Sequence, residues 1–112
     1  MDEIRKRLRE IHDEVPPDYY DRSMKENLLQ RFWHTRRIRA ISEMLGSGQG
    51  LLLDIGCAGG TLLERVAKDA GVKDAVGVDA SFRAVKYAAS MHGWAKYICA
   101  DFFELPFKDS SF

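Results

Sequence analysis

The sequence predicts an α/β fold in which short parallel strands alternate with helices. The first observation is the stretch 51–61, where an apolar run ends in an acid and a glycine-rich turn leads into an amphipathic pattern. The second is that two further apolar runs, 75–79 and 97–101, also end in an acid. Strand, glycine turn and helix in this order bring backbone close to nucleotide-like ligands in parallel sheets. We therefore expect a ligand site at one edge of the sheet.

The composition is that of one ordinary globular domain, with 112 residues, 46% hydrophobic and 30% charged. The 17 basic and 17 acidic side chains balance, so we expect no nucleic-acid or membrane partner. No apolar run approaches the ~20 residues of a membrane span, and the charged N-terminus leads into no signal-peptide core, so we expect a cytoplasmic protein. Cys57 and Cys99 lack metal-ligand spacing, which predicts free, mostly buried thiols and no bound metal.

The first helix is predicted over residues 2–15, where apolar residues recur every three or four positions until Pro16 stops the pattern. This helix either packs on the domain or forms a lid over a ligand. Residues 18–21 are predicted as a linker. Tyr19 and Tyr20 within it either anchor the loop or offer a hydroxyl group or a ring to a ligand.

A second, long helix is predicted from Ser23, which forms a capping box with Glu26, to Leu45. Glycines at 46, 48 and 50 end it. We accordingly divide the chain into 1–22, a helix and linker, and 23–112, which holds the strands. The apolar positions expected to face the core are Leu28, Leu29, Phe32, Trp33, Ile38, Ile41, Met44 and Leu45.

The opposite face of this helix carries basic residues, and we expect most of them to be solvated. The alternatives are a nucleic-acid patch, which the balanced charge disfavours, or one arginine that binds a carboxylate ligand. The residues concerned are Arg31, His34, Arg36, Arg37 and Arg39.

Two more helices are predicted between the strands. The first has an apolar face from Leu62 to Ala70 and closes at Gly71. The second begins after Ser81, a suitable cap, and ends at Gly93. Its inward residues are predicted to be Phe82, Val85 and Ala88 or Ala89. Right-handed crossovers then give a parallel sheet with helices on its faces.

The glycine spacing in 54–60 separates possible cofactors. A dinucleotide loop needs G-x-G-x-x-G, but Ala58 and Thr61 stand where the second and third glycines belong. The P-loop pattern is absent. The pattern that fits is acid-x-Gly-x-small-x-Gly, formed by Asp54, Gly56, Ala58 and Gly60.

Residues 54–60 resemble the first motif of class I S-adenosylmethionine-dependent methyltransferases, and 76–81 resemble the second. Residues 100–101, followed by 105–107 and 110–112, resemble the third region in the small-molecule branch related to ubiquinone and menaquinone methyltransferases. The resemblance runs from about residue 28 to the end. It implies a Rossmann-like fold, S-adenosylmethionine as cofactor and methyl transfer to a small-molecule acceptor.

The resemblance also implies a cofactor site from three motifs: Asp54, Gly56, Cys57, Ala58, Gly60, Asp79, Ala80, Ser81, Asp101 and Phe102. The first five belong to the loop that approaches the methionine part, where Asp54 orients the loop and the amino group. Ala58 replaces the usual glycine, and it costs affinity if the loop requires a positive φ.

The second and third motifs are expected to bind the nucleoside. Asp79 accepts hydrogen bonds from both ribose hydroxyls, and Ala80 and Ser81 lie beside the adenine. Asp101 accepts from the adenine amino group, and Phe102 flanks the ring. We identify no catalytic base, because we expect His34 and His92 on the surface or at helix ends and His12 on the N-terminal helix.

Only three strands are predicted, whereas a fourth follows in the family. We therefore expect part of a longer enzyme with strand 51–55 at an exposed edge, which a homodimer could also cover. The first function hypothesis is a small-molecule methyltransferase. The alternative is a non-catalytic module that binds S-adenosylmethionine or a partner chain. A different nucleotide-binding domain is disfavoured by the glycine spacing.

Overall fold

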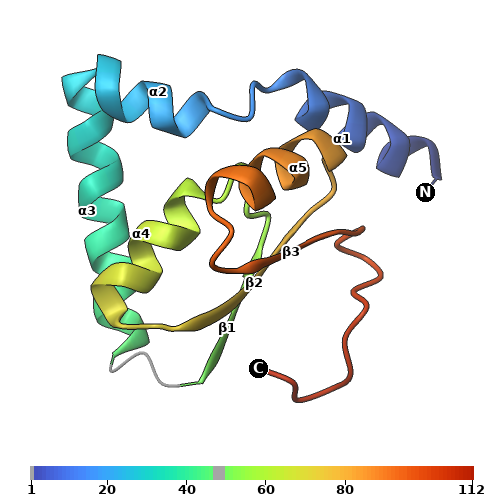
Figure 1. Ribbon diagram of the computed structural model, residues 1–112. Helices are drawn as coiled ribbons and strands as arrows, with labels where there is room; N and C mark the ends of the chain where they lie inside the picture. The colour runs from blue at the N-terminus through green and yellow to red at the C-terminus, as the bar shows by residue number, and fades with distance from the viewer. Residues whose placement is uncertain (1, 47–49) are drawn as a thin grey trace.

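The computed structural model describes residues 2–46 and 50–112 and confirms the predicted α/β fold (Figure 1). Gly48, predicted to help end the long helix, lies outside the described residues. The strands are β1 (Leu51–Ile55), β2 (Asp74–Asp79) and β3 (Lys96–Cys99), which form one parallel sheet in the order β1-β2-β3. The helices of the described part are α1 (Asp2–Glu14), α2 (Tyr19–Glu26), α3 (Leu28–Leu45), α4 (Thr61–Ala70) and α5 (Phe82–Met91).

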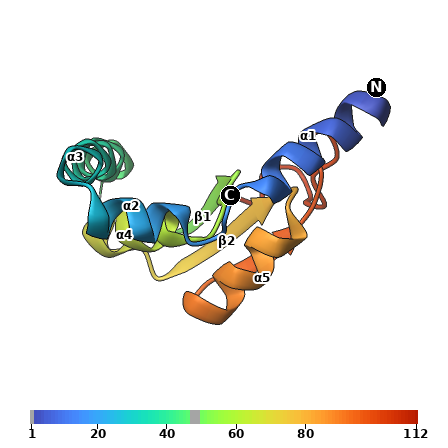
Figure 2. The same ribbon diagram turned by 90° about the horizontal axis from the view of Figure 1, so that it is seen from above.

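Both connections between strands step across the sheet in the same direction. Because such crossovers are right-handed, α4 and α5 lie on the same face of the sheet (Figure 2). α3 packs beside α4. β1 pairs with β2 alone among the described strands, and its residues Leu51 and Ile55 are exposed. The prediction that the first strand forms an edge is therefore confirmed for this part of the chain.

The core comprises buried residues of β2, α4 and α5 and a cluster between α2, α3 and α4. Val76 and Val78 are buried in β2, the central strand, and Val78 is completely inaccessible (0%). A continuous apolar run is typical of such a strand in a parallel sheet. α5 packs against this strand, and its Ala88 is buried, whereas Val66 of α4 clusters with Met24 of α2 and Ile38 of α3. This core holds the carboxyl ends of the strands in place.

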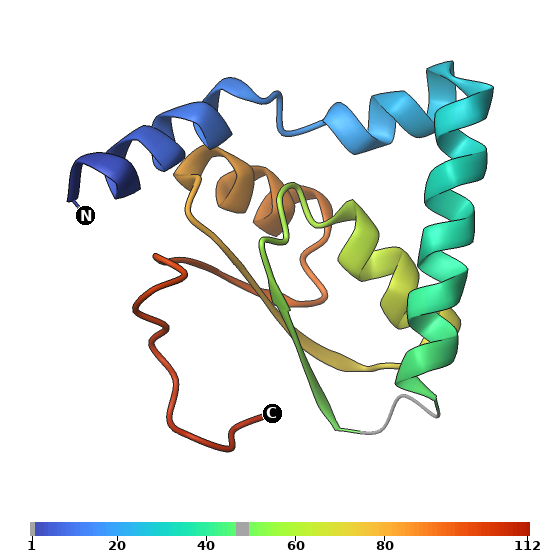
Figure 3. The same ribbon diagram turned by 180° about the vertical axis from the view of Figure 1, so that it is seen from behind.

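α1 and α2 pass over the carboxyl ends of the strands instead of covering a face of the sheet. Figures 1 and 3 show both helices above the turn that follows β1, with α1 close to the start of α5. The N-terminal helix was expected to pack on the domain or to cover a ligand. Its position above the strand ends is compatible with both roles. None of the helices in the described part combines the length and apolar character needed to cross a membrane.

Two predictions for the N-terminal region are wrong. Three residues of the predicted linker 18–21 are helical, because α2 begins at Tyr19 with Asp18 as its N-cap. The predicted long helix is two helices, and Ser23 is buried inside α2 and forms no capping box. The helix break occurs at Asn27, whose backbone is extended (φ −130°, ψ 110°). Its side chain accepts a hydrogen bond from the backbone N–H of Gln30 (3.1 Å), so Asn27 caps α3.

The predicted core face of α3 is largely exposed. Leu29 and Trp33 are 81% and 73% exposed, and the residues of α3 that are buried are Ile38 and Ser42. Within the described residues α3 packs along α4 and the end of α2, so only one narrow side of it is covered. Other predicted core positions are also exposed: Leu28, Phe32, Ile41, Met44 and Leu45.

The ends of α4 and α5 were predicted from their capping residues. Gly71 ends α4 in the left-handed conformation (φ 72°), and Ser81 caps α5 by accepting a hydrogen bond from Ala84 N (3.2 Å). Both predictions are confirmed. The predicted end at Gly93 is slightly late, because His92 is the C-cap of α5.

Three further expectations need correction. Phe82 was expected to point inward but is exposed, because the buried face of α5 runs from Ala84 to Ala88. His92 lies at a helix end, as expected, since it is the C-cap of α5; it is also buried, and its ring is bonded to the Glu64 carboxylate. Cys57 is buried as expected, whereas Cys99 is exposed. β3 ends at Cys99, two residues before the predicted end at Asp101.

Candidate functional site

The glycine-rich loop between β1 and α4 is fixed against β2. The backbone N–H groups of Gly56 and Cys57 both donate to the Val78 carbonyl (2.6 and 3.0 Å). Gly60 is the N-cap of α4 with a φ of 85°, a conformation that favours glycine. A Cβ at Gly60 would also lie 3.1 Å from both Ala88 Cβ and the Tyr97 hydroxyl. The loop is therefore held closely against β2, α5 and β3.

Asp79, at the end of β2, joins the first and second motifs. The residue is only 4% exposed, and its carboxylate accepts hydrogen bonds from Ala58 N and Ser81 N, each at 2.9 Å. One bond goes to each carboxylate oxygen, and an ionised carboxylate has about four acceptor positions. Asp79 therefore fixes the loop and retains acceptor capacity for a ligand.

The site is electronegative. Burial and the nearby Asp79 raise the pKa of Asp54 to about 6. Burial and the charges of Asp54 and Asp79 raise the pKa of Cys57 to about 12, so its thiol is protonated at neutral pH. Such a site favours a cationic ligand group over an anionic one. It also makes Cys57 a poor nucleophile.

A cavity of about 450 Å³ lies beside this loop. The structure brings together five of the predicted site residues on its wall, namely Gly56, Ala58, Asp79, Ser81 and Phe102. The N-terminal segment supplies another part of the wall: His12, Val15, Pro16, Pro17, Tyr19 and Tyr20. The predicted site residues from three parts of the chain thus meet in one place.

A second cavity, of about 500 Å³, adjoins the first, because Tyr20, Gly56 and Ala58 line both. Asp54 and Arg37 lie on its wall. The Arg37 guanidinium is 5.9 Å from the centre of the Tyr20 ring. The sequence suggested a ligand role for Tyr20 or for one arginine of α3, and only the folded chain shows which arginine borders the site.

Asp54 and Cys57 line the second cavity only, and three predicted site residues line neither cavity. Gly60 is buried at the N-cap of α4, and Ala80 is half-buried behind Ser81. Asp101 is engaged elsewhere: one oxygen accepts from Phe103 N (3.0 Å) and the other lies 3.6 Å from Arg5 Nε of α1. α1 therefore contacts the residue expected to meet adenine.

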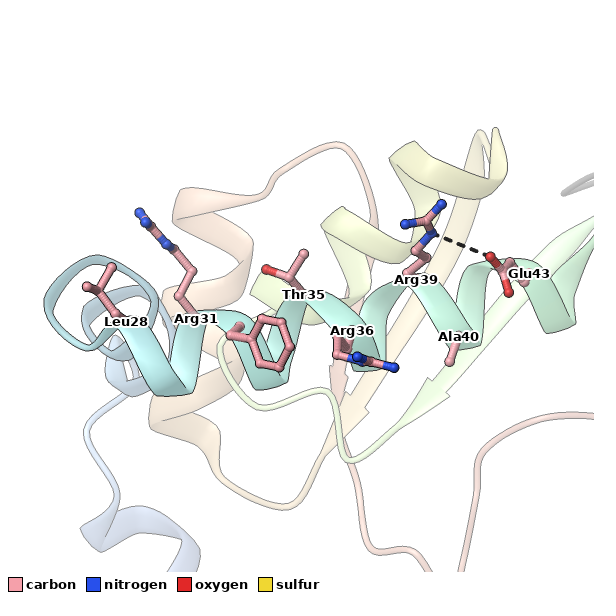
Figure 4. Close-up of a pocket in the computed structure, with 8 residues that line it drawn as sticks. Leu28, Arg31, Thr35, Arg36, Arg39, Ala40 and Glu43 are labelled. Atoms are coloured by element: carbon pink, nitrogen blue, oxygen red, sulfur yellow. Dashed lines mark ion pairs between the residues drawn. The ribbon is translucent and has the colours of Figure 1, made fainter.

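A larger hollow, of about 750 Å³, runs along α3 and is separate from this site (Figure 4). All of its lining residues belong to that helix, among them Arg31, Arg36 and Arg39. Arg39 forms an ion pair with Glu43 (3.5 Å) on the same helix. A shallow groove on one helix brings no residues of other elements together. No group of three or more potential metal ligands is found among the described residues.

Comparison with known proteins identifies the class. A family model described as a methyltransferase domain matches residues 52–112, more than half of the chain. The chain therefore belongs to the methyltransferase domain family, which confirms the prediction made from the three motifs. Among curated proteins, none matches this sequence.

Solved structures share the fold. A methyltransferase from Haloferax volcanii, in complex with the Trm112 methyltransferase activator, is 24% identical with a TM-score of 0.60 over 80% of this chain and 42% of its own. The N-methyltransferase NodS from Bradyrhizobium japonicum WM9, in complex with S-adenosylhomocysteine, is 21% identical (TM-score 0.59; 80% and 50% covered). The plantazolicin methyltransferase BpumL, also with S-adenosylhomocysteine, is 24% identical (TM-score 0.55; 96% and 46% covered). The chain spans half or less of the length of these proteins.

Proposed function

We propose that this chain binds S-adenosylmethionine and forms the cofactor-binding part of a methyltransferase that acts on a small molecule. The observation that carries the proposal is the position of Asp79. Its buried carboxylate joins the glycine loop to Ser81 and still faces the cavity. Residues of the three motifs thereby line one cavity. The chain also belongs to the methyltransferase domain family.

In this proposal the free acceptor positions of Asp79 bind the ribose hydroxyls. Phe102 and Ser81 border the adenine, and Asp101 accepts from its amino group once the contact with Arg5 rearranges. The loop from Gly56 to Gly60 presents backbone to the methionine part.

Asp54 and Arg37 offer opposite charges on the second cavity. An amino-acid group fits such a pair, with its ammonium near Asp54 and its carboxylate held by the Arg37 guanidinium. S-adenosylmethionine supplies the activated methyl group when bound. The protein then contributes position and electrostatics. The electronegative loop suits the positive charge of a sulfonium.

The acceptor is proposed to be a small molecule because residues 100–101, 105–107 and 110–112 resemble the small-molecule branch of these enzymes. The two adjoining cavities, of about 450 and 500 Å³, are assigned to the cofactor. NodS and BpumL have the same fold, which is compatible with this proposal. Membership of the ubiquinone and menaquinone branch, cytoplasmic location and dimerisation through β1 stay predictions.

Calorimetric titration with S-adenosylhomocysteine and with NAD tests the proposal. We expect the first to bind and the second not to bind. NAD binding without S-adenosylhomocysteine binding would reject the assignment.

The role of Asp79 needs a sharper test, because its substitution also loosens the loop. The wild-type chain and Asp79→Asn are each titrated with S-adenosylhomocysteine and with its 2′-deoxy analogue. Removal of the hydroxyl should cost the wild type about 1–3 kcal/mol of binding free energy and the variant much less. Equal costs in both proteins would remove Asp79 from the ribose site.

A further inference from the structure

The N-terminal segment is bonded to the same residues that form the candidate cofactor site. We define the strap as residues 12–21, from the end of α1 to the first turn of α2. We propose that the strap is a closed outer wall of the cofactor pocket, and that Asp21 is the positioning residue that keeps it closed. The proposal rests on the proposed function, because it concerns the release of S-adenosylmethionine.

The first end of the strap is fastened to the second motif. The Ser81 hydroxyl donates to the Asp13 carboxylate, and Arg83 Nη1 donates to the Asp13 carbonyl (3.3 Å). Ser81 lines the cavity and caps α5. The strap is thus joined to a residue expected beside the adenine.

The middle of the strap lies directly on the glycine loop. A Cβ built on Gly59 would collide with the Pro17 carbonyl oxygen and lie 3.1 Å from Tyr87 Cδ1. Gly59 has no unusual φ, so the need for glycine there comes from the close approach of the strap. Pro16 and Pro17 fix their φ angles at this point. The number of conformations that an open strap can adopt is therefore small.

The second end of the strap is fastened at Asp21. One carboxylate oxygen accepts from the Thr61 hydroxyl (2.9 Å) and the other from the Tyr87 hydroxyl (2.6 Å). Thr61 is the first residue of α4, directly after the loop, and is buried. The hydrogen bond to Asp21 raises the pKa of Tyr87 to about 12. Asp21 therefore ties α2 to the first motif through two charge-assisted hydrogen bonds, which are stronger than neutral ones.

These contacts hold the strap against the cavity as one of its walls. His12, Val15, Pro17 and Tyr20 line the cavity from this side. In this proposal a cofactor in the cavity leaves when the strap moves away. Asp21 joins two hydroxyls of different helices, so its loss should open the strap without removing any residue expected to touch the cofactor.

The test compares Asp21→Asn with Asp18→Asn, a matched control that removes the same charge from the same segment. Asp18 does not cap α2 with its side chain. Hydrogen exchange of the strap in the free chain should rise about tenfold in Asp21→Asn and stay unchanged in the control, with β2 equally protected in all three proteins. Dissociation and association of S-adenosylhomocysteine, followed by stopped flow, should both accelerate about tenfold in Asp21→Asn, because entry and exit both require the open strap.

Equal exchange and equal dissociation rates in wild type and Asp21→Asn would overturn the proposal. So would an effect of the same size in Asp18→Asn. If Asp21→Asn fails to fold, Tyr87→Phe removes one of the two bonds and should raise strap exchange by a smaller factor. A wild-type chain that does not bind S-adenosylhomocysteine would reject the cofactor assignment, while the exchange measurement still decides whether Asp21 holds the strap.

Discussion

Replacing Ala58 with glycine should stabilise the protein. Ala58 stands where the family motif has glycine, and its φ is 48°, in the left-handed region. Its backbone N–H is held by Asp79 (2.9 Å), so the loop cannot relax without losing that bond. The loop therefore requires a positive φ at this position, and alanine introduces backbone strain there.

The magnitude follows from two opposing terms. A non-glycine residue in the left-handed region costs about 1–2 kcal/mol because its Cβ crowds the backbone. Glycine removes this strain but gains freedom in the unfolded chain, which costs about 0.4–1 kcal/mol. The net effect is a rise of roughly 0.5–1 kcal/mol in the free energy of unfolding, or a few degrees in the melting temperature of a domain of this size.

Thermal and denaturant unfolding of Ala58→Gly measure this change. Ala89→Gly, at an exposed position inside α5, is the matched control and should instead destabilise by about 1 kcal/mol. A loss of stability in Ala58→Gly, similar to that of the control, would refute the argument. It would mean that the alanine methyl group contributes packing that exceeds the backbone strain.

Two further predictions follow from the same site and core. Because the folded-state pKa of Asp54 is raised from 3.8 to about 6, stability from its protonated form is lost as pH rises from about 4 to above 6. Asp54→Asn should abolish this pH dependence. At pH 7.5 its free energy of unfolding should exceed that of the wild type by an amount on the order of 2–3 kcal/mol. A wild-type free energy of unfolding that does not fall between about pH 4 and pH 6 would contradict the reasoning. Val78→Ala should lower the free energy of unfolding by about 2–3 kcal/mol, since Val78 is fully buried; a change below 0.5 kcal/mol in denaturant unfolding, on the order of a surface substitution, would show that the core repacks around the gap.

The predictions that succeeded depend on local signals. Residues that are close in the sequence specify the strand 51–55, the cap at Ser81 and the end of α4 at Gly71. Apolar runs and capping chemistry act over short distances, so the sequence reveals them directly. The class of protein could also be predicted, because three motifs occur in a fixed order along the chain.

The predictions that failed depend on what packs against what. Trp33 is apolar and correctly placed on a helix, yet it is exposed, because only one side of α3 meets another element in the described part of the chain. Asn27 breaks the expected long helix by accepting a hydrogen bond from Gln30 N, whereas Ser23 and Glu26 gave an equally good capping pattern. A pattern of polarity states which side of a helix can be buried but not what covers it.

By itself, the sequence determined that Asp54 and Asp79 lie at the ends of parallel strands and that a glycine loop follows the first of them. Their convergence at one edge follows from right-handed crossovers. Only the tertiary structure decided that Asp79 holds Ala58 N, that Arg37 borders the site and that Asp21 reaches Thr61 and Tyr87. These contacts join residues 21 to 66 positions apart, and no local rule of backbone or side-chain preference relates such positions until the sheet has formed.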